Sequence, residues 1–334
     1  MGQLYPICPG SVKSLICHQR GLMIDCDIFQ LQLKTSHWYN NKMMIKNLLI
    51  SMRPKQWVKN VFIFAPMIFS LHMFQLDFIK RSLLAFFLFS LVNGGIYIFN
   101  DILDREKDRQ HPEKKNRPIA AGRLSIASAG IFAAVLLAGV LLLTASFNLE
   151  FFYISLFYVF LNILYSLLLK SMVIIDIMVI ALGFVLRVMV GAAVNQLILS
   201  PWILISTFLL AIFLALIKRR QELLKIQNLN PEKVTRRTLL SYNVNLLDQM
   251  ISISTATTLI SYIMYVLSPD VQQKFHTVKL FYTVPFVIFG IFRYLFLSYA
   301  KGEGESPSEI IYTDLPFTIN IILWVSVFIL LVKN

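Results

Sequence analysis

Long apolar stretches separated by short polar loops dominate the pattern of this chain. Nine stretches of roughly 17 to 22 residues can be placed, each about the length that crosses a bilayer as a helix. Because the membrane interior offers no water to the backbone, such segments satisfy their hydrogen bonds as helices. The pattern predicts an all-α, polytopic membrane helix bundle. The nine expected spans lie at roughly 57–74, 82–100, 124–146, 149–169, 173–194, 201–217, 248–268, 279–299 and 315–332.

The composition fits a membrane protein and argues against a soluble one. Of the 334 residues, 57% are hydrophobic and 15% are charged, which leaves too few polar residues to cover the core of a soluble protein of this length. The net charge of +13 invites a nucleic-acid interpretation, but the positive charge lies in loops between apolar stretches, as the positive-inside rule describes. We therefore expect no nucleic-acid partner; the lipid bilayer and phosphorylated substrates are the expected partners.

Lysine and arginine gather in three segments that fall on one side of the membrane if nine spans are present. These are the segment before the first span, the loop after the second and the loop after the sixth. Positive charge marks the cytoplasmic side, so the sequence predicts a multi-pass protein of the inner (plasma) membrane with a cytoplasmic N-terminus. The two long loops also hold most of the acidic residues, which topology alone does not require, and we expect the active site there.

The first 43 residues differ from the rest of the chain. They lack a charged segment followed by an apolar run and a small-residue cleavage site, so they do not form a signal peptide. All the cysteines, Cys8, Cys17 and Cys26, lie here without a disulfide or zinc-site spacing. We expect residues 1–43 to be an extension outside the fold, or the result of a start assigned too far upstream. Residues 44–334 are expected to form a single transmembrane catalytic domain.

An acidic motif at the end of the second span carries the strongest chemical signal. Asn100, Asp104 and Asp108 are spaced i, i+4, i+8, and Asp101 lies three and seven residues before the two later aspartates. If the helix continues through the motif, all four side chains share one face, where three carboxylates repel one another unless a cation lies between them. Hard oxygen ligands with room for water suit Mg²⁺ shared with a diphosphate. The alternative is a solvated helix end in which interleaved basic residues form ion pairs.

The motif is followed closely by Arg117-Pro118-Ile119-Ala120-Ala121-Gly122. Together the two segments resemble the first signature of the UbiA superfamily of membrane prenyltransferases, N-D-x-x-D-x-x-x-D followed by a basic residue and R-P-[IL]-x-x-G. The resemblance covers about 44–332, essentially all of the expected membrane region. It implies a UbiA-like bundle with its active site at the cytoplasmic face and Mg²⁺ as cofactor. The implied catalytic residues are Asn100, Asp101, Asp104 and Asp108, of which Asp101, Asp104 and Asp108 are the implied metal ligands.

The loop after the sixth span departs from the usual pattern of that superfamily. A second acidic motif, D-x-x-x-D, is expected there, but the chain reads Lys218-Arg219-Arg220-Gln221-Glu222-Leu223. One acidic and one basic wall suit a donor with an additional phosphate, or an acceptor that is itself a phosphate, since arginine binds oxyanions through two N–H groups at once. With the segments around Arg53, Tyr165 and Arg187, this basic segment resembles the decaprenyl-phosphate phosphoribosyltransferase branch.

That resemblance implies transfer of 5-phosphoribose from 5-phosphoribosyl 1-diphosphate to a polyprenyl (decaprenyl-like) phosphate, with Mg²⁺ and release of diphosphate, for cell-envelope precursor synthesis. The lipid phosphate is already anionic at neutral pH, so the reaction needs no strong general base. The residues expected to bind the substrates are Arg53, Lys55, Lys59, Asn60, Lys114, Arg117, Tyr165, Lys170, Asp176, Arg187, Lys218, Arg219, Arg220 and Glu222.

Structural roles compete with some of these assignments. Lys59 and Asn60 would also fit an anchor at the membrane interface. Asp176 could hold two helices together through an ion pair with Lys170 or Arg187, because ionisable groups in a membrane are usually paired or functional. The sequence leaves both interpretations open.

Two other functions fit parts of the pattern. A UbiA-type prenyltransferase that moves an isoprenoid from a prenyl diphosphate to an aromatic acceptor shares the first motif, but the basic segment lacks ligands for its second metal. A membrane transporter should show interrupted spans and internal repeats, and the sequence contains no convincing repeat. The polyprenyl length and a homo-oligomeric state are left open.

Overall fold

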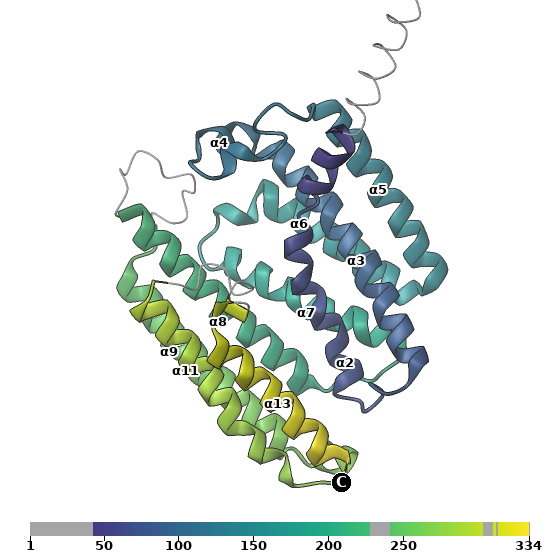
Figure 1. Ribbon diagram of the computed structural model, residues 1–334, viewed down its shortest axis with the longest axis vertical. Helices are drawn as coiled ribbons and strands as arrows, with labels where there is room; N and C mark the ends of the chain where they lie inside the picture. The colour runs from purple at the N-terminus through teal and green to yellow at the C-terminus, as the bar shows by residue number, and fades with distance from the viewer. Residues whose placement is uncertain (1–42, 228–240, 303–309, 312, 334) are drawn as a thin grey trace, which may run out of the picture.

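Helices account for all of the regular structure in the part of the chain that is described. The computed structural model describes residues 43–227, 241–302, 310–311 and 313–333, and no strand occurs in those ranges. Residues 1–42, nearly all of the expected N-terminal extension, lie outside the described residues. Figure 1 shows the helices packed side by side as one bundle, with short connections at its two ends.

Eight helices within the described ranges are long and apolar enough to cross a membrane. They correspond to the second to ninth expected spans, because an apolar run of this length is a strong helix signal. The all-α, multi-pass membrane architecture is therefore confirmed. The long helices are α3 (Leu76–Leu103), α5 (Ile126–Phe147), α6 (Leu149–Leu167), α7 (Ile175–Asn195), α8 (Pro201–Gln227), α9 (Val244–Leu267), α11 (Val284–Ala300, preceded by the 3-10 helix η6, Lys279–Thr283) and α13 (Leu315–Lys333).

The first expected span, 57–74, differs from one continuous α-helix. An initial helical stretch is followed by a turn at Arg53, whose φ is +52°, then by the 3-10 helix η1 (Pro54–Phe64) and the short helix α2 (Ala65–Ile68). Proline disfavours the helical conformation of the residue before it, so Pro54 explains why the break falls at Arg53. The purple segment in Figure 1 runs along the bundle and packs against α3 and α7.

The helix α7 is at the centre of the bundle and packs against α3, α6, α8 and η1. Its Gly191 lies so close to η1 that an added Cβ would be 1.9 Å from the carbonyl oxygen of Ile63, a distance that no larger residue tolerates. The core around α7 includes Phe89 of α3 and Tyr158 of α6. Because protein interiors are densely packed, these contacts hold the polar side chains of α3 and α7 in fixed positions.

The acidic motif lies where α3 ends. After Leu103, Asp104 joins α3 to the short helix α4 (Arg105–Gln110), and the 3-10 helix η2 (Lys114–Asn116) follows. The expectation of one helix through the whole motif is therefore wrong beyond Asp104. The irregularity is local, because the backbone N–H groups of Asp104 and Asp108 still bond the carbonyls four residues earlier, at 2.9 and 2.8 Å. Figure 1 shows α4 and the C-terminal end of α8 at the same end of the bundle.

Candidate functional site

Asp101 and Asp108 converge on one guanidinium group. Asp101 is buried near the end of α3, and Asp108 is buried on α4. Nη1 of Arg117, which follows η2, lies 3.1 Å from Oδ1 of Asp101 and 2.6 Å from Oδ2 of Asp108. A single cationic group therefore bridges two carboxylates that come from different helices.

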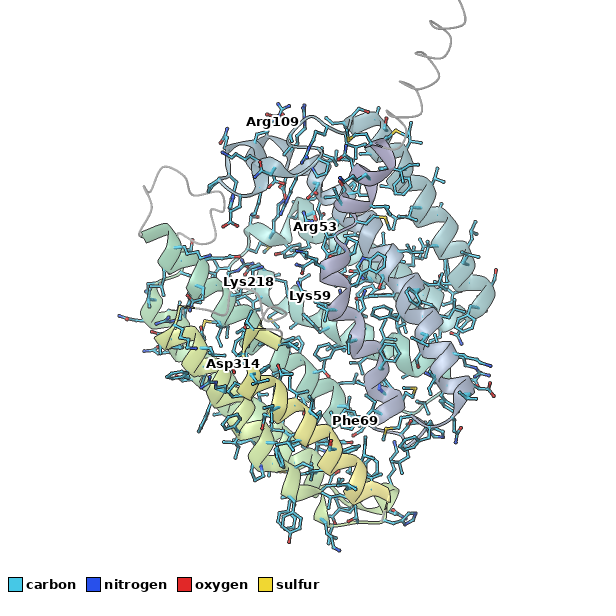
Figure 2. All side chains as sticks on the ribbon, in the orientation of Figure 1. Arg53, Lys59, Phe69, Arg109, Lys218 and Asp314 are labelled. Atoms are coloured by element: carbon cyan, nitrogen blue, oxygen red, sulfur yellow. The ribbon has the colours of Figure 1, made fainter. Side chains whose placement is uncertain are left out.

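A second arginine reaches the same site from the first part of the chain. Arg53 donates a hydrogen bond to Asp101, and its guanidinium lies 4.9 Å from the centre of the Tyr97 ring. In Figure 2, Arg53 lies in the interior of the bundle, near the end that carries Arg109. A buried carboxylate is unfavourable unless it is paired, and Asp101 is compensated by two arginines.

The other two motif residues have partners from α6 and the connection to α7. Oδ1 of Asp104 lies 2.7 Å from Nζ of Lys170 on the 3-10 helix η3 (Leu169–Ser171). The side-chain oxygen of Asn100 accepts a hydrogen bond from Ser166 of α6. The Asp104 side chain is 30% exposed, against 2% for Asp101. The motif thus has one open carboxylate and two that are enclosed.

The motif supplies hard oxygen ligands for a divalent metal without forming a complete ligand cage. Asp101 and Asp108 are near enough to share one cation. Across the residues that the structure describes, no three Asp, Glu, His or Cys side chains gather into a metal site. Mg²⁺ is commonly held by one or two carboxylates together with water and substrate phosphates. The residues present fit a metal of that kind, with a bound diphosphate supplying further ligands.

Arg187 of α7 is a buried cation whose hydrogen-bond partners are neutral. It donates to Oδ1 of Asn60 at 2.8 Å, to Oδ1 of Asn93 at 3.1 Å, to the Tyr158 hydroxyl at 3.0 Å and to the Gly183 carbonyl at 2.6 Å. It also lies over three aromatic rings. Ionisable groups inside a membrane bundle are costly and commonly mark functional positions. Arg187 therefore adds a positive charge to the interior that these partners do not cancel.

Lys59 of η1 lies among other cations. The charged side chains that act on it most strongly are Lys218, Arg187 and Arg53. Figure 2 shows Arg53, Lys59 and Lys218 in the same interior region, between η1 and α8. Like charges in a partly enclosed space attract anions, and phosphate oxygens are favourable partners for lysine and arginine. The structure thus brings together four of the residues that the sequence assigns to substrate binding.

Arg219 of the basic segment is engaged in a buried ion pair. Its Nε lies 2.9 Å from Oδ2 of Asp176, at the start of α7, and its Nη1 lies 2.6 Å from Oε2 of Glu222. From the sequence, the structural partner expected for Asp176 was Lys170 or Arg187. That expectation is wrong, because Lys170 pairs with Asp104 and Arg187 has neutral partners. The Asp176 pair joins α7 to α8.

Tyr242, just before α9, completes this pair. Its hydroxyl donates to Oδ1 of Asp176 at 3.2 Å and accepts the backbone N–H of Ile174 at 2.7 Å. Burial and the neighbouring carboxylate raise the pKa of Tyr242 to about 12, so the hydroxyl stays protonated at neutral pH. The Asp176 side chain, which is 0% exposed, therefore has partners from α8 and from the segment before α9.

Arg220 joins α8 to two further helices. Its Nε lies 2.6 Å from Oδ1 of Asp248 on α9, and its guanidinium is 3.8 Å from the centre of the Tyr299 ring on α11. Tyr299 in turn donates to Asp248 at 2.6 Å. Of the three consecutive cations at 218–220, Lys218 is thus the one that lies near Lys59.

The remaining candidates lie around the two clusters. Lys55 is exposed on η1, and Lys114 is partly buried on η2. Tyr165 of α6 is close enough to Arg219 to interact with its charge. Burial and Lys114 lower the pKa of His111, beside the motif, so that this imidazole is neutral at pH 7.

Sequence reasoning missed several neutral partners in the site. Asn93, Tyr158 and Ser166 bond Arg187 or Asn100, yet none was a candidate. Each is a polar residue within an apolar span, and that was the signal that could have identified them. Asp248 carried no comparable signal, because its pairing with Arg220 depends on how α8 and α9 pack.

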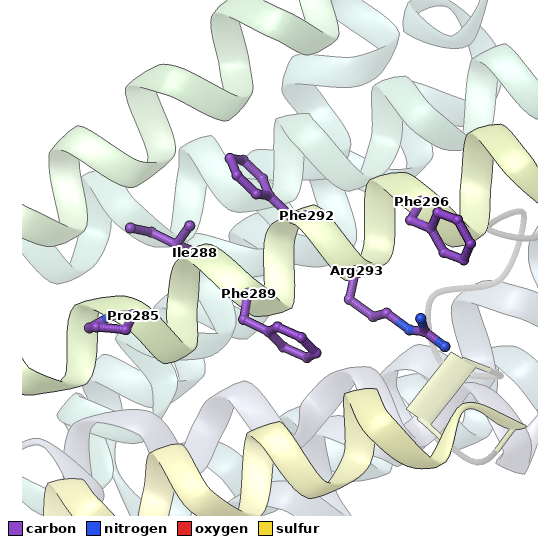
Figure 3. A pocket seen from close by; sticks show the side chains of 6 residues that line it. All are labelled: Pro285, Ile288, Phe289, Phe292, Arg293 and Phe296. Carbon is purple, nitrogen blue, oxygen red and sulfur yellow. The ribbon is translucent and has the colours of Figure 1, made fainter.

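A groove of about 490 Å³ runs along α11, on an outward face of the bundle (Figure 3). Apart from Arg293, its lining is apolar, which suits contact with lipid chains. Arg293 donates to both oxygens of Asp314, at 3.0 and 2.7 Å, and this bond holds the pKa of Asp314 below its usual range. The lining residues are Pro285, Ile288, Phe289, Phe292, Arg293 and Phe296.

The fold and the site define a multi-pass membrane protein with converging carboxylates and interior cations at one end, an arrangement suited to an anionic ligand and its metal. The model of the UbiA prenyltransferase family matches residues 61–308. The chain therefore belongs to this family of membrane transferases, and the resemblance seen in the motif at 100–122 is confirmed.

Individual relatives agree with this placement. Decaprenyl-phosphate phosphoribosyltransferase of Corynebacterium glutamicum is 30% identical over 292 residues, which cover 85% of this chain and 86% of that protein. An uncharacterised protein of Sinorhizobium fredii is 30% identical over 242 residues, 72% of this chain; the match spans only 47% of that longer protein.

A solved structure shares the fold. A UbiA homologue from Archaeoglobus fulgidus, bound to DMAPP and Mg²⁺, has a TM-score of 0.64 and 19% identity, and the match covers 86% of this chain and 99% of that one. At this identity the likeness concerns the fold alone.

Proposed function

We propose that this protein transfers 5-phosphoribose from 5-phosphoribosyl 1-diphosphate to a polyprenyl phosphate, such as decaprenyl phosphate, and releases diphosphate. The reaction depends on Mg²⁺ and takes place at the cytoplasmic face of the inner membrane, where the positively charged loops are expected. The similarity to decaprenyl-phosphate phosphoribosyltransferase of Corynebacterium glutamicum supports this choice of substrates.

The observation that carries the proposal is the position of cations beside the acidic motif. Asp101 and Asp108 converge at one end of the bundle, and Lys59 and Lys218 lie near Arg53, which contacts Asp101. A prenyl diphosphate carries charge only at its diphosphate. The phosphoribosyl donor has a further phosphate, and the polyprenyl acceptor has one as well, so both substrates need cations beyond those that face the carboxylates.

The proposed reaction exchanges one C–O bond for another. An oxygen of the lipid phosphate attacks C1 of the ribose, the bond from C1 to the diphosphate breaks, and the electron pair leaves with the diphosphate. Bound Mg²⁺ would neutralise the charge that develops on that leaving group. Asp101 and Asp108 would hold the metal, and Arg53 and Arg117 would donate hydrogen bonds to the oxygens of the diphosphate. The acceptor oxygen is already anionic, so no side chain has to remove a proton.

The cations near Lys59 are assigned to the phosphates that do not react. Lys59 and Lys218 bind the 5-phosphate of the donor or the phosphate of the lipid, and the buried charge of Arg187 strengthens the local positive potential. Because Arg187 already makes four hydrogen bonds to neutral groups, it acts through its charge and through the position of Asn60. The isoprenoid tail of the acceptor lies along apolar helix faces in the bilayer.

A comparison of two donors tests the proposal. Purified protein in lipid nanodiscs receives Mg²⁺ with either labelled 5-phosphoribosyl 1-diphosphate and decaprenyl phosphate, or labelled geranyl diphosphate and an aromatic acceptor. We expect a labelled lipid from the first pair only. Asp101→Asn should slow its formation by about two to three orders of magnitude, whereas Lys115→Met, an exposed change on η2, should not. A product from the second pair alone would show that the chain is a prenyltransferase acting on aromatic acceptors.

A further inference from the structure

Every carboxylate of the acidic motif is paired with a cation that lies outside the motif. The cations come from three separate places: the turn before η1, the loop after η2 and the connection between α6 and α7. Three positive side chains therefore face three negative ones, and the group has no net formal charge. The pairs are Arg53–Asp101, Arg117–Asp101, Arg117–Asp108 and Lys170–Asp104.

This pairing opposes the binding of a metal ion alone. A divalent cation that bridges Oδ1 of Asp101 and Oδ2 of Asp108 must displace Nη1 of Arg117, which lies within hydrogen-bond distance of both oxygens. The ion would also add two positive charges to a neutral group whose Arg53 already lies near Lys59. A diphosphate brings negative charge of the same order and gives the displaced arginine new acceptors.

We infer that Arg53, Arg117 and Lys170 are exchangeable partners that couple metal binding to diphosphate binding. They hold the carboxylates while no ligand is bound, and they move to phosphate oxygens when the metal and the diphosphate enter together. Lys170 holds Asp104 in the ligand-free protein through a contact of 2.7 Å. The inference rests on the proposed function only in requiring a ligand with a diphosphate group.

The surroundings of the three cations permit such an exchange. The side chains of Arg53 and Arg117 are each 27% exposed, and that of Lys170 is 19% exposed. Arg219, in its pair with Asp176, is 3% exposed. The first three can therefore change partners without disturbing the helix packing, whereas Arg219 cannot. Since the exchange breaks only ion pairs and hydrogen bonds, it needs no other reactant.

The wild-type protein provides the first test. Radioactive Mn²⁺ serves as the metal probe and inorganic diphosphate as the ligand, and spin columns measure the metal retained by protein in nanodiscs. We expect Mn²⁺ alone to bind weakly and diphosphate to tighten its binding by about tenfold or more, within the usual range for coupled sites. Equal affinity for Mn²⁺ with and without diphosphate would overturn the inference, and this result requires no variant to fold.

A charge-removing variant provides the second test. Lys170→Met frees Asp104, so Mn²⁺ alone should bind several-fold more tightly and the gain from diphosphate should shrink. The matched control, Lys115→Met, removes the same charge from an exposed position on η2 and should behave as the wild type. An affinity for Mn²⁺ alone that is unchanged or weaker in Lys170→Met would contradict the role of Lys170. Neither test contains a ribosyl donor, so each outcome is independent of whether the donor assay succeeds.

Discussion

Two groups of ion pairs lie at the same end of the bundle and differ in how far their members are enclosed. Around the acidic motif, Arg117 and Lys170 keep part of their surface exposed while they bond Asp101 and Asp104. In the basic segment, Arg219 and Asp176 are both buried, at 3% and 0% exposure. We call the partly exposed pairs around Asp101, Asp104 and Asp108 the open group, and the buried pair of Arg219 and Asp176 the closed group. Pairs of the open group can exchange one partner for a ligand, whereas the closed group holds helices together.

This difference in exposure changes the role that can be assigned to the basic segment, residues 218–223. The segment lies where the superfamily pattern has its second pair of aspartates. From the sequence alone, its three consecutive cations are expected to bind phosphate. All three lie within ion-pair distance of a carboxylate: Lys218 of Glu222 at 3.8 Å, Arg219 of Asp176 and Glu222, and Arg220 of Asp248. Arg219 and Arg220 therefore join α8 to α7 and α9, and Lys218, whose side chain is 45% exposed, is the member that lies near Lys59.

The largest effect is expected from Asp101→Asn in the open group. The change removes a carboxylate that is proposed to hold the metal, so the transfer rate should fall by about two to three orders of magnitude, as when a key electrostatic group is removed from an active site. Initial rates with labelled donor measure the loss. Thermal unfolding should change little, because Arg53 and Arg117 can reach water. Wild-type function in this variant would contradict catalysis by the motif and favour transport.

Arg219→Met should destabilise the protein by removing the ion pair of the closed group. Removing one partner of a buried pair leaves Asp176 uncompensated, which commonly costs about 3 to 5 kcal/mol. Chemical denaturation of the protein in detergent micelles measures the free energy of unfolding. Arg220→Met is the matched control: its pair with Asp248 is more exposed, and the expected loss is about 1 kcal/mol or less. Equal losses of unfolding free energy in the two variants would mean that burial does not determine how much an ion pair contributes to stability here.

Lys59→Met tests the interior cations that adjoin the open group. If Lys59 contacts a phosphate of the substrate, the variant loses one charge-assisted hydrogen bond, and KM for the donor should rise about tenfold with a small change in kcat. Steady-state kinetics at saturating acceptor measures both constants. Lys107→Met removes the same charge from an exposed position on α4 and should leave KM unchanged. An unaltered KM in Lys59→Met would show that this lysine does not bind the donor.

Much of the architecture could be predicted from the sequence, because apolar runs of membrane length leave few alternatives. The exceptions are the two places where the backbone departs from a helix, at Arg53 and at Asp104. Pro54 is a local signal for the first break. The second has no clear local signal, and it falls at the residue whose carboxylate bonds Lys170.

Which residues belong to the candidate site could be predicted from the sequence better than which of them form ion pairs or hydrogen bonds with each other. Lysine and arginine have long side chains, and their partners depend on how helices distant in the sequence pack. The sequence offered Lys170 or Arg187 as partners of Asp176, and the structure has Arg219. Likewise, Arg187 obtains Asn93 and Tyr158 through the packing of α3 and α6 on α7.

The smallest effect is expected from Tyr242→Phe, which removes one hydrogen bond from the closed group. Loss of the hydroxyl that donates to Asp176 should cost about 1 kcal/mol of unfolding free energy. The pKa of Tyr242 is raised from 10.0 to about 12, so folding favours the protonated hydroxyl. Its contribution is complete below the ordinary pKa and is lost as the pH rises through the folded value. The stability difference between wild type and Tyr242→Phe should therefore shrink between about pH 9 and pH 12, because only the wild type carries this hydroxyl. Denaturation of both proteins across that range measures it, and a constant difference would mean that Asp176 does not depend on the protonated hydroxyl.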